Sequence, residues 1–217
     1  IAKQWNSHSC DAFSLQFSFN PLEAAIESTR LLHTNGETVQ MLVFTRKSAT
    51  LANIELQNVF NPSFGEASLE RAHKAPWRMN DKIIATENYY ESGELLICNG
   101  SLGMLSSIDH ASKKIQGRFD GVTRTFTCGT TEIDHSYALT LHKYQGSEID
   151  CVVVCLDYVP SMASREALYT AATRAKKRVI IHCNPQIWTI ACSRNENDRE
   201  TRLSYFIQRC SKKRSIQ

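Results

Sequence analysis

The spacing of hydrophobic residues at the start of the chain predicts a strand, a helix and a second strand. Residues 13–19 (FSLQFSF) alternate with a period of two, which is typical of a β-strand. Asn20 can cap a helix over PLEAAIESTRLL, with Pro21 at its first position. Residues 38–46 (TVQMLVFTR) form a nearly continuous apolar run, as expected for a strand that is buried on both faces.

A second helix and a change in composition follow this strand. Ser48 can cap a helix over ATLANIELQNVF, and the Asn-Pro pair at residues 61–62 predicts its end. Residues 62–136 are richer in Gly, Ser and Asn, and contain the short strand candidates DKIIATEN and ELLIC. Asn99 and Gly100 lie between two apolar runs, which is typical of a two-residue β-hairpin. We expect an inserted antiparallel β unit here.

Strands and helices then alternate again. Apolar runs predict strands at residues 137–142 (YALTLH), 151–156 (CVVVCL) and 178–183 (RVIIHC). Ser164 can cap a helix over SREALYTAATRA, and two more helices are predicted near residues 185–193 and 199–210.

This order of elements predicts an α/β fold: a parallel sheet flanked by helices, split by a small antiparallel β insertion. The expected division is 1–61 and 137–217 for the two parts of the α/β domain, and 62–136 for the insertion.

The charge balance changes this picture little. The chain has 25 Lys and Arg against 22 Asp and Glu, a net charge of +3, which is compatible with nucleic-acid binding but does not argue for it. Hydrophobic residues make up 42% of the chain, enough for a real core.

The eight cysteines favour an intracellular protein with reduced thiols, because no pair has C-x-x-C spacing and several lie in apolar runs. No metal site is expected, since the histidines are scattered: His73, His110, His135 and His142. No stretch is long and apolar enough for a membrane span. The chain begins with Ile1 rather than Met, so we expect it to be part of a longer protein.

Candidate ligand contacts follow three predicted strands or helices, at places where open α/β sheets bind ligands. Arg46 ends the run MLVFTR, and Arg174, on a helix with a small-residue face, could offer a fixed guanidinium to phosphate. In the corner after LTLH, Gly146 permits close backbone approach to phosphate and Glu148 could accept a hydrogen bond from ribose. Taken singly, each feature is more often a surface arginine or a simple turn.

In combination these segments resemble superfamily 1 helicases of the RecD-like and Pif type. LTLHKYQGSEID and ALYTAATRAKKRVIIH match the family's motifs V and VI, and VFTRKSATLANIELQNVFNP resembles its motif IV. PWRMNDKIIATENYY and LLICNGSLGML are similar to the small β-barrel inserted in RecD-like proteins. Two positions depart from the pattern: Asn80 stands where Gly is usual, and Tyr90 where an acid is common.

The resemblance implies the second RecA-like (P-loop NTPase-type) domain of an ATP-dependent DNA helicase. It implies that Arg46 and Arg174 approach the γ-phosphate of ATP, with Arg174 as an arginine finger. The remaining site residues it implies are Gly146, Glu148 and Gln145 for nucleotide, and Thr140, His142, Lys143 and Asn53 for nucleic acid.

The chain contains no G-x-x-x-x-G-K-[ST] loop. The resemblance therefore implies that ATP and Mg²⁺ are bound mainly by an N-terminal RecA-like domain of the same protein, and that this chain alone is inactive. It also implies 5′-to-3′ movement on single-stranded or forked DNA, with RNA as the alternative substrate.

A reading from a different class is a non-catalytic module that binds single-stranded nucleic acid by stacking. The aromatic residues available for it are Trp77, Tyr89, Tyr90, Phe119 and Phe126. Stacking requires these rings to be exposed, whereas we expect most of them in the core of the insertion.

Overall fold

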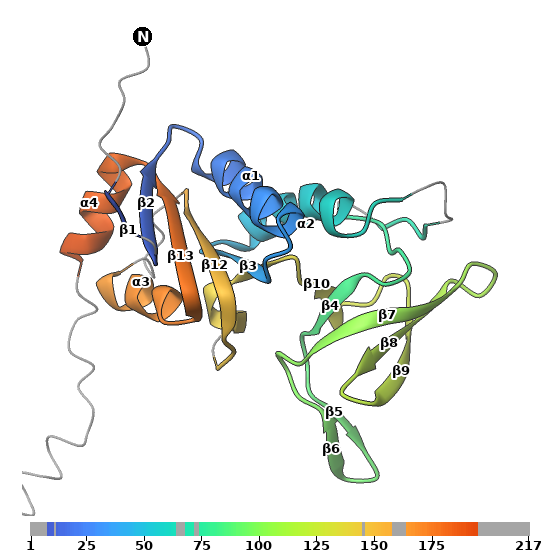
Figure 1. The fold of residues 1–217 in the computed structure, drawn as a ribbon. Helices are drawn as coiled ribbons and strands as arrows, with labels where there is room; N and C mark the ends of the chain where they lie inside the picture. The colour runs from blue at the N-terminus through green and yellow to red at the C-terminus, as the bar shows by residue number, and fades with distance from the viewer. Residues whose placement is uncertain are drawn as a thin grey trace, which may run out of the picture.

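The computed structural model describes residues 8–10, 12–63, 68–71, 74–144, 146–157 and 164–194, and within it a six-stranded sheet forms the centre of the molecule (Figure 1). Its strand order is β1-β2-β13-β12-β3-β11, in which β1 alone runs antiparallel to its neighbour. The strands are β1 (His8–Cys10), β2 (Phe13–Phe17), β3 (Val39–Val43), β11 (Ala138–Thr140), β12 (Ile149–Leu156) and β13 (Ala175–Cys183). The predicted parallel sheet is confirmed.

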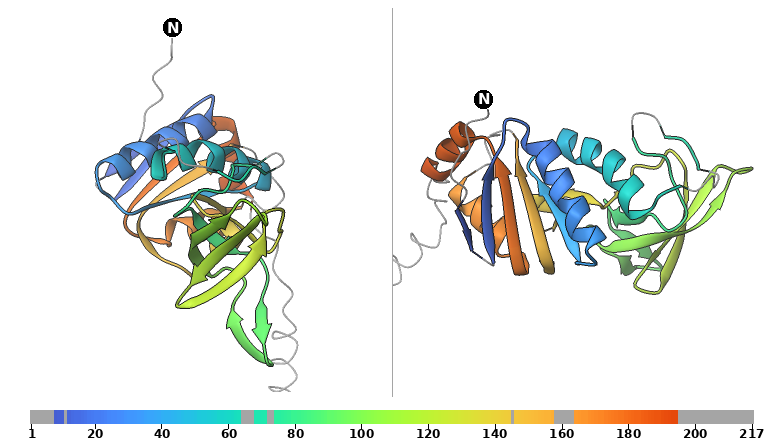
Figure 2. Two further views of the ribbon diagram at one scale, coloured as in Figure 1. Left: turned by 90° about the vertical axis from the view of Figure 1, so that its right-hand side faces the viewer. Right: turned by 45° about the horizontal axis from the view of Figure 1, so that its top comes forward.

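Helices cover both faces of this sheet (Figure 2). One face packs against α1 (Pro21–Thr34) and α2 (Arg46–Phe60), which bury Ala25 and Leu56 against Met41 and Val153. The other face packs against α3 (Arg165–Ala172) and α4 (Pro185–Ser193). Every residue of β3 is buried, as its continuous apolar sequence predicts.

The predicted caps of α1 and α3 are confirmed, and that of α2 is wrong. Asn20 and Ser164 accept hydrogen bonds from the first turns of α1 and α3. Helix α2 begins earlier than predicted, because Thr45 has extended backbone angles and its hydroxyl accepts a hydrogen bond from the Ser48 amide at 3.1 Å. Arg46 is consequently the first residue of α2.

The insertion is a curled antiparallel sheet that forms a half-barrel beside the β11 edge of the central sheet (Figures 1 and 2). Its order is β10-β4-β7-β8-β9, from β4 (Lys82–Ala85), β7 (Leu102–Asp109), β8 (Lys114–Phe119), β9 (Val122–Thr127) and β10 (Ile133–His135). A core that includes Trp77, Leu105 and Phe119 fills its concave side. A separate hairpin of β5 (Tyr89–Glu91) and β6 (Glu94–Ile97) extends from it.

The hairpin predicted at Asn99 and Gly100 is a turn, but it does not join paired strands. The Ser101 amide donates to the Cys98 carbonyl at 3.0 Å, and Gly100 has a φ of +93°. However, β6 pairs with β5 and β7 pairs with β4, so this turn redirects the chain from one sheet to the other. Gly100 has a positive φ and Asn99 does not, which fits a type II turn rather than the I′ turn of a tight hairpin.

A buried carboxylate connects the insertion to the central domain. Asp81 is fully buried and accepts hydrogen bonds from side chains of α2 and from the segment that leads into β11. Just before it, Asn80 has a φ of +64°, in the left-handed region that favours Gly and tolerates Asn. This conformation explains why Asn can stand at a position where the family usually has Gly.

The described part of the chain has no helix that is long and apolar enough to cross a membrane. Six of its cysteines are free thiols: Cys98, Cys128 and Cys192, and the buried Cys151, Cys155 and Cys183. The helix predicted near residues 199–210 lies outside the described residues, and the division at residues 61 and 136 stays a prediction.

Candidate nucleic-acid and nucleotide contacts

A short 3₁₀ helix presents two of the predicted nucleic-acid contacts. Strand β11 ends at Thr140, two residues before its predicted end, and the chain continues as η1 (Leu141–Tyr144). Residues three apart in a 3₁₀ helix lie on the same side, and here Leu141 and Tyr144 are buried in the core. The buried side chains of Leu141 and Tyr144 therefore anchor η1, and His142 and Lys143 between them face outward.

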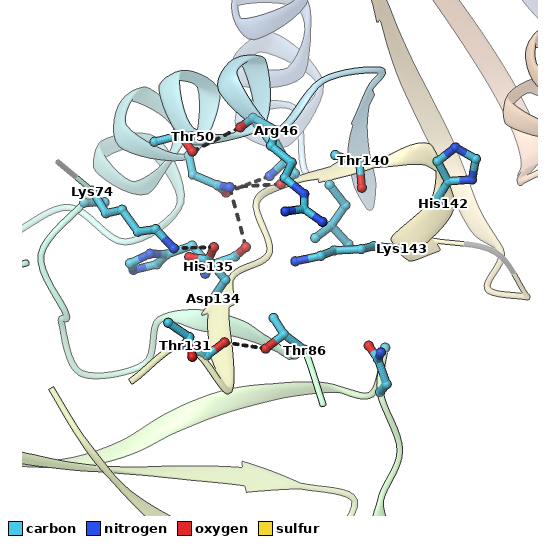
Figure 3. A pocket seen from close by; sticks show the side chains of 17 residues that line it. Arg46, Thr50, Lys74, Thr86, Thr131, Asp134, His135, Thr140, His142 and Lys143 are labelled. Carbon is cyan, nitrogen blue, oxygen red and sulfur yellow. Dashed lines mark hydrogen bonds and ion pairs between the residues drawn. The ribbon is translucent and has the colours of Figure 1, made fainter. Parts of the chain in front are cut away.

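These residues line a pocket of about 890 Å³ between the central domain and the insertion (Figure 3). Three segments that are distant in sequence form it: the first half of α2, the β11–η1 segment, and the ends of the strands of the insertion. Arg46, Asn53, Thr140, His142 and Lys143 all line it, so the structure brings together the four predicted nucleic-acid residues and one predicted catalytic residue.

The pocket has an excess of positive charge. Its charged residues are Arg46, Lys74, Lys143 and a single carboxylate, Asp134, which is paired with Lys74 at 2.8 Å. Burial lowers the pKa of Lys143, and the charges of Lys74 and Arg46 lower it further while Asp134 opposes them. An anion bound here would offset this repulsion among cations, so the site favours phosphate.

Asn53 lines the pocket, but its amide is used by the protein itself. Its Nδ2 donates to the Ala138 carbonyl at 2.9 Å, and its Oδ1 accepts from the Ala138 amide at 2.8 Å. The buried Gln40 side chain donates to the carbonyls of Ser136 and Tyr137 at 3.2 and 3.0 Å. Asn53 and Gln40 thus fix the course of β11, and Asn53 acts on the pocket by positioning Thr140.

The predicted nucleotide residues lie at the other end of the parallel strands. Gly146, with a φ of +92°, and Glu148 precede β12, and the Ile149 amide donates to the Arg174 carbonyl at 3.0 Å. Gln145 lies outside the described residues. Arg174 is not on α3 as predicted, because the helix ends at Ala172 and Arg174 lies in the turn before β13.

The Arg174 side chain is nevertheless held by its neighbours. Its Nε donates to the Thr170 carbonyl at 3.2 Å, and its Nη2 lies 3.4 Å from the Thr173 hydroxyl. The guanidinium is therefore oriented by the last turn of α3, which leaves part of its fork for a ligand.

The strand register separates the backbone positions of Arg46 and Arg174 along the sheet. In the parallel register, Ala175 pairs with Ile149 and Val43 pairs with Cys155. The six-residue step along β12 corresponds to about 20 Å. Arg46 follows the edge at Val43 and lines the pocket, whereas Arg174 lies at the opposite edge. The expectation that both arginines approach one γ-phosphate stays a prediction.

Most of the aromatic residues considered for a single-strand stacking module are not accessible in the structure. Trp77, Phe119 and Phe126 are buried in the core of the insertion, and Tyr89 is partly covered. The Trp77 indole also donates to the Cys128 carbonyl at 2.9 Å. Of the five proposed rings Tyr90 alone is exposed, at 57%, and one exposed ring is not a stacking platform.

The sequence patterns missed Lys74, Asp134 and the buried residues behind them. The Arg71 guanidinium lies 3.0 Å from His135 Nδ1, and His135 Nε2 lies 3.0 Å from Asp81. Because arginine can only donate, Nδ1 accepts and the ring proton of a neutral His135 lies on Nε2, directed at Asp81. Arg71 also stacks on Trp77 at 3.8 Å from the ring centroid. Within the described residues, no three His, Cys, Asp or Glu side chains gather in an arrangement that could hold a metal ion.

Comparison with known proteins identifies the class. Residues 135–182, which include β11, η1, β12, α3 and most of β13, match the family model of the UvrD-like helicase C-terminal domain. The chain is 34% identical over 154 residues to the ATP-dependent RecD2 DNA helicase of Deinococcus radiodurans, which is 70% of this chain and 20% of that protein. It is 35% identical over 105 residues to the RecBCD enzyme subunit RecD of Mycolicibacterium smegmatis, which is 48% of this chain and 18% of that protein.

The fold is similar to that of Pif1 helicases in a structure concerned with DNA unwinding at forked double-stranded DNA. The TM-score is 0.51 at 15% sequence identity, over 91% of this chain and 53% of that chain. Residues 135–182 thus match a helicase C-terminal domain, and the chain is similar in sequence to RecD helicases and in fold to Pif1 helicases. It spans about one fifth of the length of the curated relatives described above.

Proposed function

We propose that this chain is the C-terminal motor half of an ATP-dependent helicase that moves along nucleic acid and unwinds it. One observation carries the proposal: only two residues lie between Lys143, in the cationic pocket, and Gly146, where the edge formed with Glu148 and Arg174 begins. Lys143 is part of η1, which is anchored by the buried side chains of Leu141 and Tyr144. A shift at the nucleotide edge would be transmitted through this short, packed segment to the bound strand.

In this proposal Arg174 completes an ATP site that is held mainly by an N-terminal RecA-like domain of the same protein. That domain would bind ATP and Mg²⁺, for which this chain has no Walker-type loop. Arg174 would stabilise the charge that develops on the transferred phosphoryl group, with Gly146 and Glu148 facing the phosphates and ribose. The RecD2 relative is described as ATP-dependent, which supports this assignment.

The cationic pocket would bind the backbone of a single strand. Arg46 and Lys143 supply charge, while Thr140 and His142 lie beside them on the wall of the pocket. We propose DNA as the substrate because the similar proteins RecD2 and Pif1 are named for action on DNA. Movement in the 5′-to-3′ direction rests on the family resemblance. The domain division at residues 61 and 136 and an intracellular location, which the free thiols fit, belong to the same proposal.

Two adjacent cations on α2 give a matched test of the nucleic-acid site. Arg46 lines the pocket, whereas Lys47 is exposed and does not. Binding of fluorescent oligo(dT) to the purified chain should weaken with Arg46→Ala and with Lys143→Ala, and stay near the wild-type level with Lys47→Ala. Equal effects of Arg46→Ala and Lys47→Ala would show nonspecific attraction and contradict the pocket assignment. Oligo(U) in the same assay compares RNA with DNA.

Because this chain would supply only part of the ATP site, we expect the purified chain alone to hydrolyse almost no ATP. A clear ATPase rate from the purified chain that Arg174→Ala abolishes would contradict the proposal. In a protein that carries both RecA-like domains, Arg174→Ala should lower the ATPase rate by about 10³-fold or more, since an arginine finger contributes at least that much.

A further inference from the structure

The β5–β6 hairpin extends away from the half-barrel (Figure 1), and its sequence is acidic. No Lys or Arg occurs between Lys82 and Lys113, whereas the hairpin and its approach carry Glu87, Glu91 and Glu94. A surface with this charge repels the phosphate backbone. The hairpin is therefore not an extension of the cationic pocket.

The base of the hairpin is firmly attached. The Arg124 guanidinium lies 4.0 Å from the centroid of the Tyr89 ring, and Ile97, which pairs with Tyr89, is buried in the core of the insertion. Asn88 accepts a hydrogen bond from the Asn99 amide at 2.7 Å. The projection is thus a fixed feature of the fold.

The two faces of the hairpin present different chemistry. Tyr90 and Leu95 are cross-strand partners and lie on one face, exposed at 57% and 45%. Glu91 and Glu94 are the next pair along and lie on the opposite face, because successive residues of a strand alternate. Like charges directly opposite each other destabilise a strand pair. Tyr90 and Leu95 leave about half of their surface in water. The Glu91–Glu94 pair is therefore not explained by the stability of this chain.

Both strands of the hairpin also have an unused edge. Within the described residues β5 and β6 pair with each other and with no third strand. An exposed edge can accept an additional strand from a partner, through main-chain hydrogen bonds and alternate side chains.

From these observations we propose that the β5–β6 hairpin is a docking site for a basic, amphipathic strand of a partner protein. The strand adds to the free edge, with its Lys or Arg side chains on the Glu91–Glu94 face and its apolar side chains on the Tyr90–Leu95 face. Because acidic and apolar residues alternate along the hairpin, the partner strand must alternate basic and apolar residues. A cationic peptide without this alternation should bind less well, which distinguishes docking from general attraction of positive charge.

The test uses the whole chain and a short blocked peptide in which Lys alternates with Val, measured by isothermal titration calorimetry. The control peptide has the same composition with its Lys and Val residues grouped. We expect the alternating peptide to bind and the grouped peptide to bind at least about tenfold more weakly. Glu91→Lys and Tyr90→Ser should each weaken binding by a similar factor, while Glu55→Lys, at an exposed position on α2, should leave binding unchanged.

Thermal unfolding of the same variants separates docking from a structural role. Glu91→Lys removes a like-charge pair, so its melting temperature should equal or exceed that of the wild type. The proposal would be overturned if both Glu91→Lys and the milder Glu91→Gln lost peptide binding and also had a lower melting temperature. Equal binding of the two peptides or no binding to the wild type would overturn it as well. So would displacement of the bound peptide by oligo(dT). Greater aggregation of Glu91→Lys with peptide binding intact would show that the glutamates only protect the edge, and would also overturn it.

Discussion

Replacing Asp81 by Ala should be among the most destabilising single changes in this chain. The carboxylate is fully buried and accepts from five donors: Gln57 Nε2, Asn61 Nδ2, the Arg78 amide, His135 Nε2 and the Tyr137 hydroxyl. Removing it leaves these donors unsatisfied in a region closed to water, at a cost of about 1–3 kcal/mol for each one that finds no new partner. Partial relaxation reduces that sum, and we expect a loss of about 3–5 kcal/mol.

The assay is urea unfolding of the purified chain, followed by tryptophan fluorescence, with Glu55→Ala on the exposed face of α2 as the control. The control should stay within about 0.5 kcal/mol of the wild type. Because Asp81 joins α2 to the segment that leads into β11, Asp81→Ala should also weaken oligo(dT) binding in conditions where the chain is still folded. A loss of stability below about 1 kcal/mol would refute the view that this carboxylate fixes the insertion to the central domain.

Three further predictions follow from single residues. Burial raises the pKa of Asp81, but hydrogen bonds from His135, Gln57 and the Arg78 amide outweigh it and hold that pKa below the ordinary value of 3.8. The carboxylate of Asp81 therefore stabilises the fold fully above pH 3.8, and this stabilisation is lost as the pH falls through the lowered pKa. The free energies of unfolding of the wild type and Asp81→Asn, measured against pH, should differ above pH 3.8 and become equal below the lowered pKa. Thr45→Ala should cost about 1 kcal/mol in thermal or urea unfolding, because it removes the cap of α2. A similar loss with Lys47→Ala, at an exposed position in the same turn, would contradict the assigned cap. Asn80→Gly should be neutral or slightly stabilising and Asn80→Val should cost at least about 1–2 kcal/mol, since φ is positive there; the reverse order in urea unfolding would contradict that backbone conformation.

Elements with a long regular pattern could be predicted from the sequence. The apolar run at 151–156 forms the last six residues of β12, and the helix expected near 185–193 is α4 with those bounds. Local turn chemistry was a weaker guide. Asp120 and Gly121 both have positive φ and join the paired strands β8 and β9, whereas the Asn99 and Gly100 pair connects strands of different sheets. Which strands pair is decided by the packing of the half-barrel, which no dipeptide encodes.

The candidate site could be predicted only in part. The residues around Thr140 and Lys143 are contiguous, so one motif locates them. Lys74 and Asp134 belong to the same pocket through tertiary structure alone. Asn53 shows a second limit, because a sequence does not reveal whether an amide faces a ligand or, as here, bonds to the backbone of β11.

The separation of the two arginines has a similar cause. Arg46 follows a strand and Arg174 precedes one, and this difference places them at opposite edges once the strands are known to be parallel. The family resemblance assigned both arginines to the γ-phosphate from their motifs alone, because a motif does not show whether its residue follows or precedes a strand. In the structure Arg46 lines the cationic pocket and Arg174 lies at the edge with Gly146 and Glu148, while a shared role at the γ-phosphate stays a prediction.

The salt dependence of oligo(dT) binding tests the central claim most directly, namely that Arg46 and Lys143 hold the phosphate backbone of a single strand in one pocket. For single strands, each phosphate contact that is lost reduces the slope of log K against log salt by about 0.7. The double variant Arg46→Ala, Lys143→Ala should therefore have a slope that is smaller by about 1.4, while Lys47→Ala keeps the wild-type slope. An unchanged slope in the double variant would contradict the account, because it would place the strand elsewhere on the molecule.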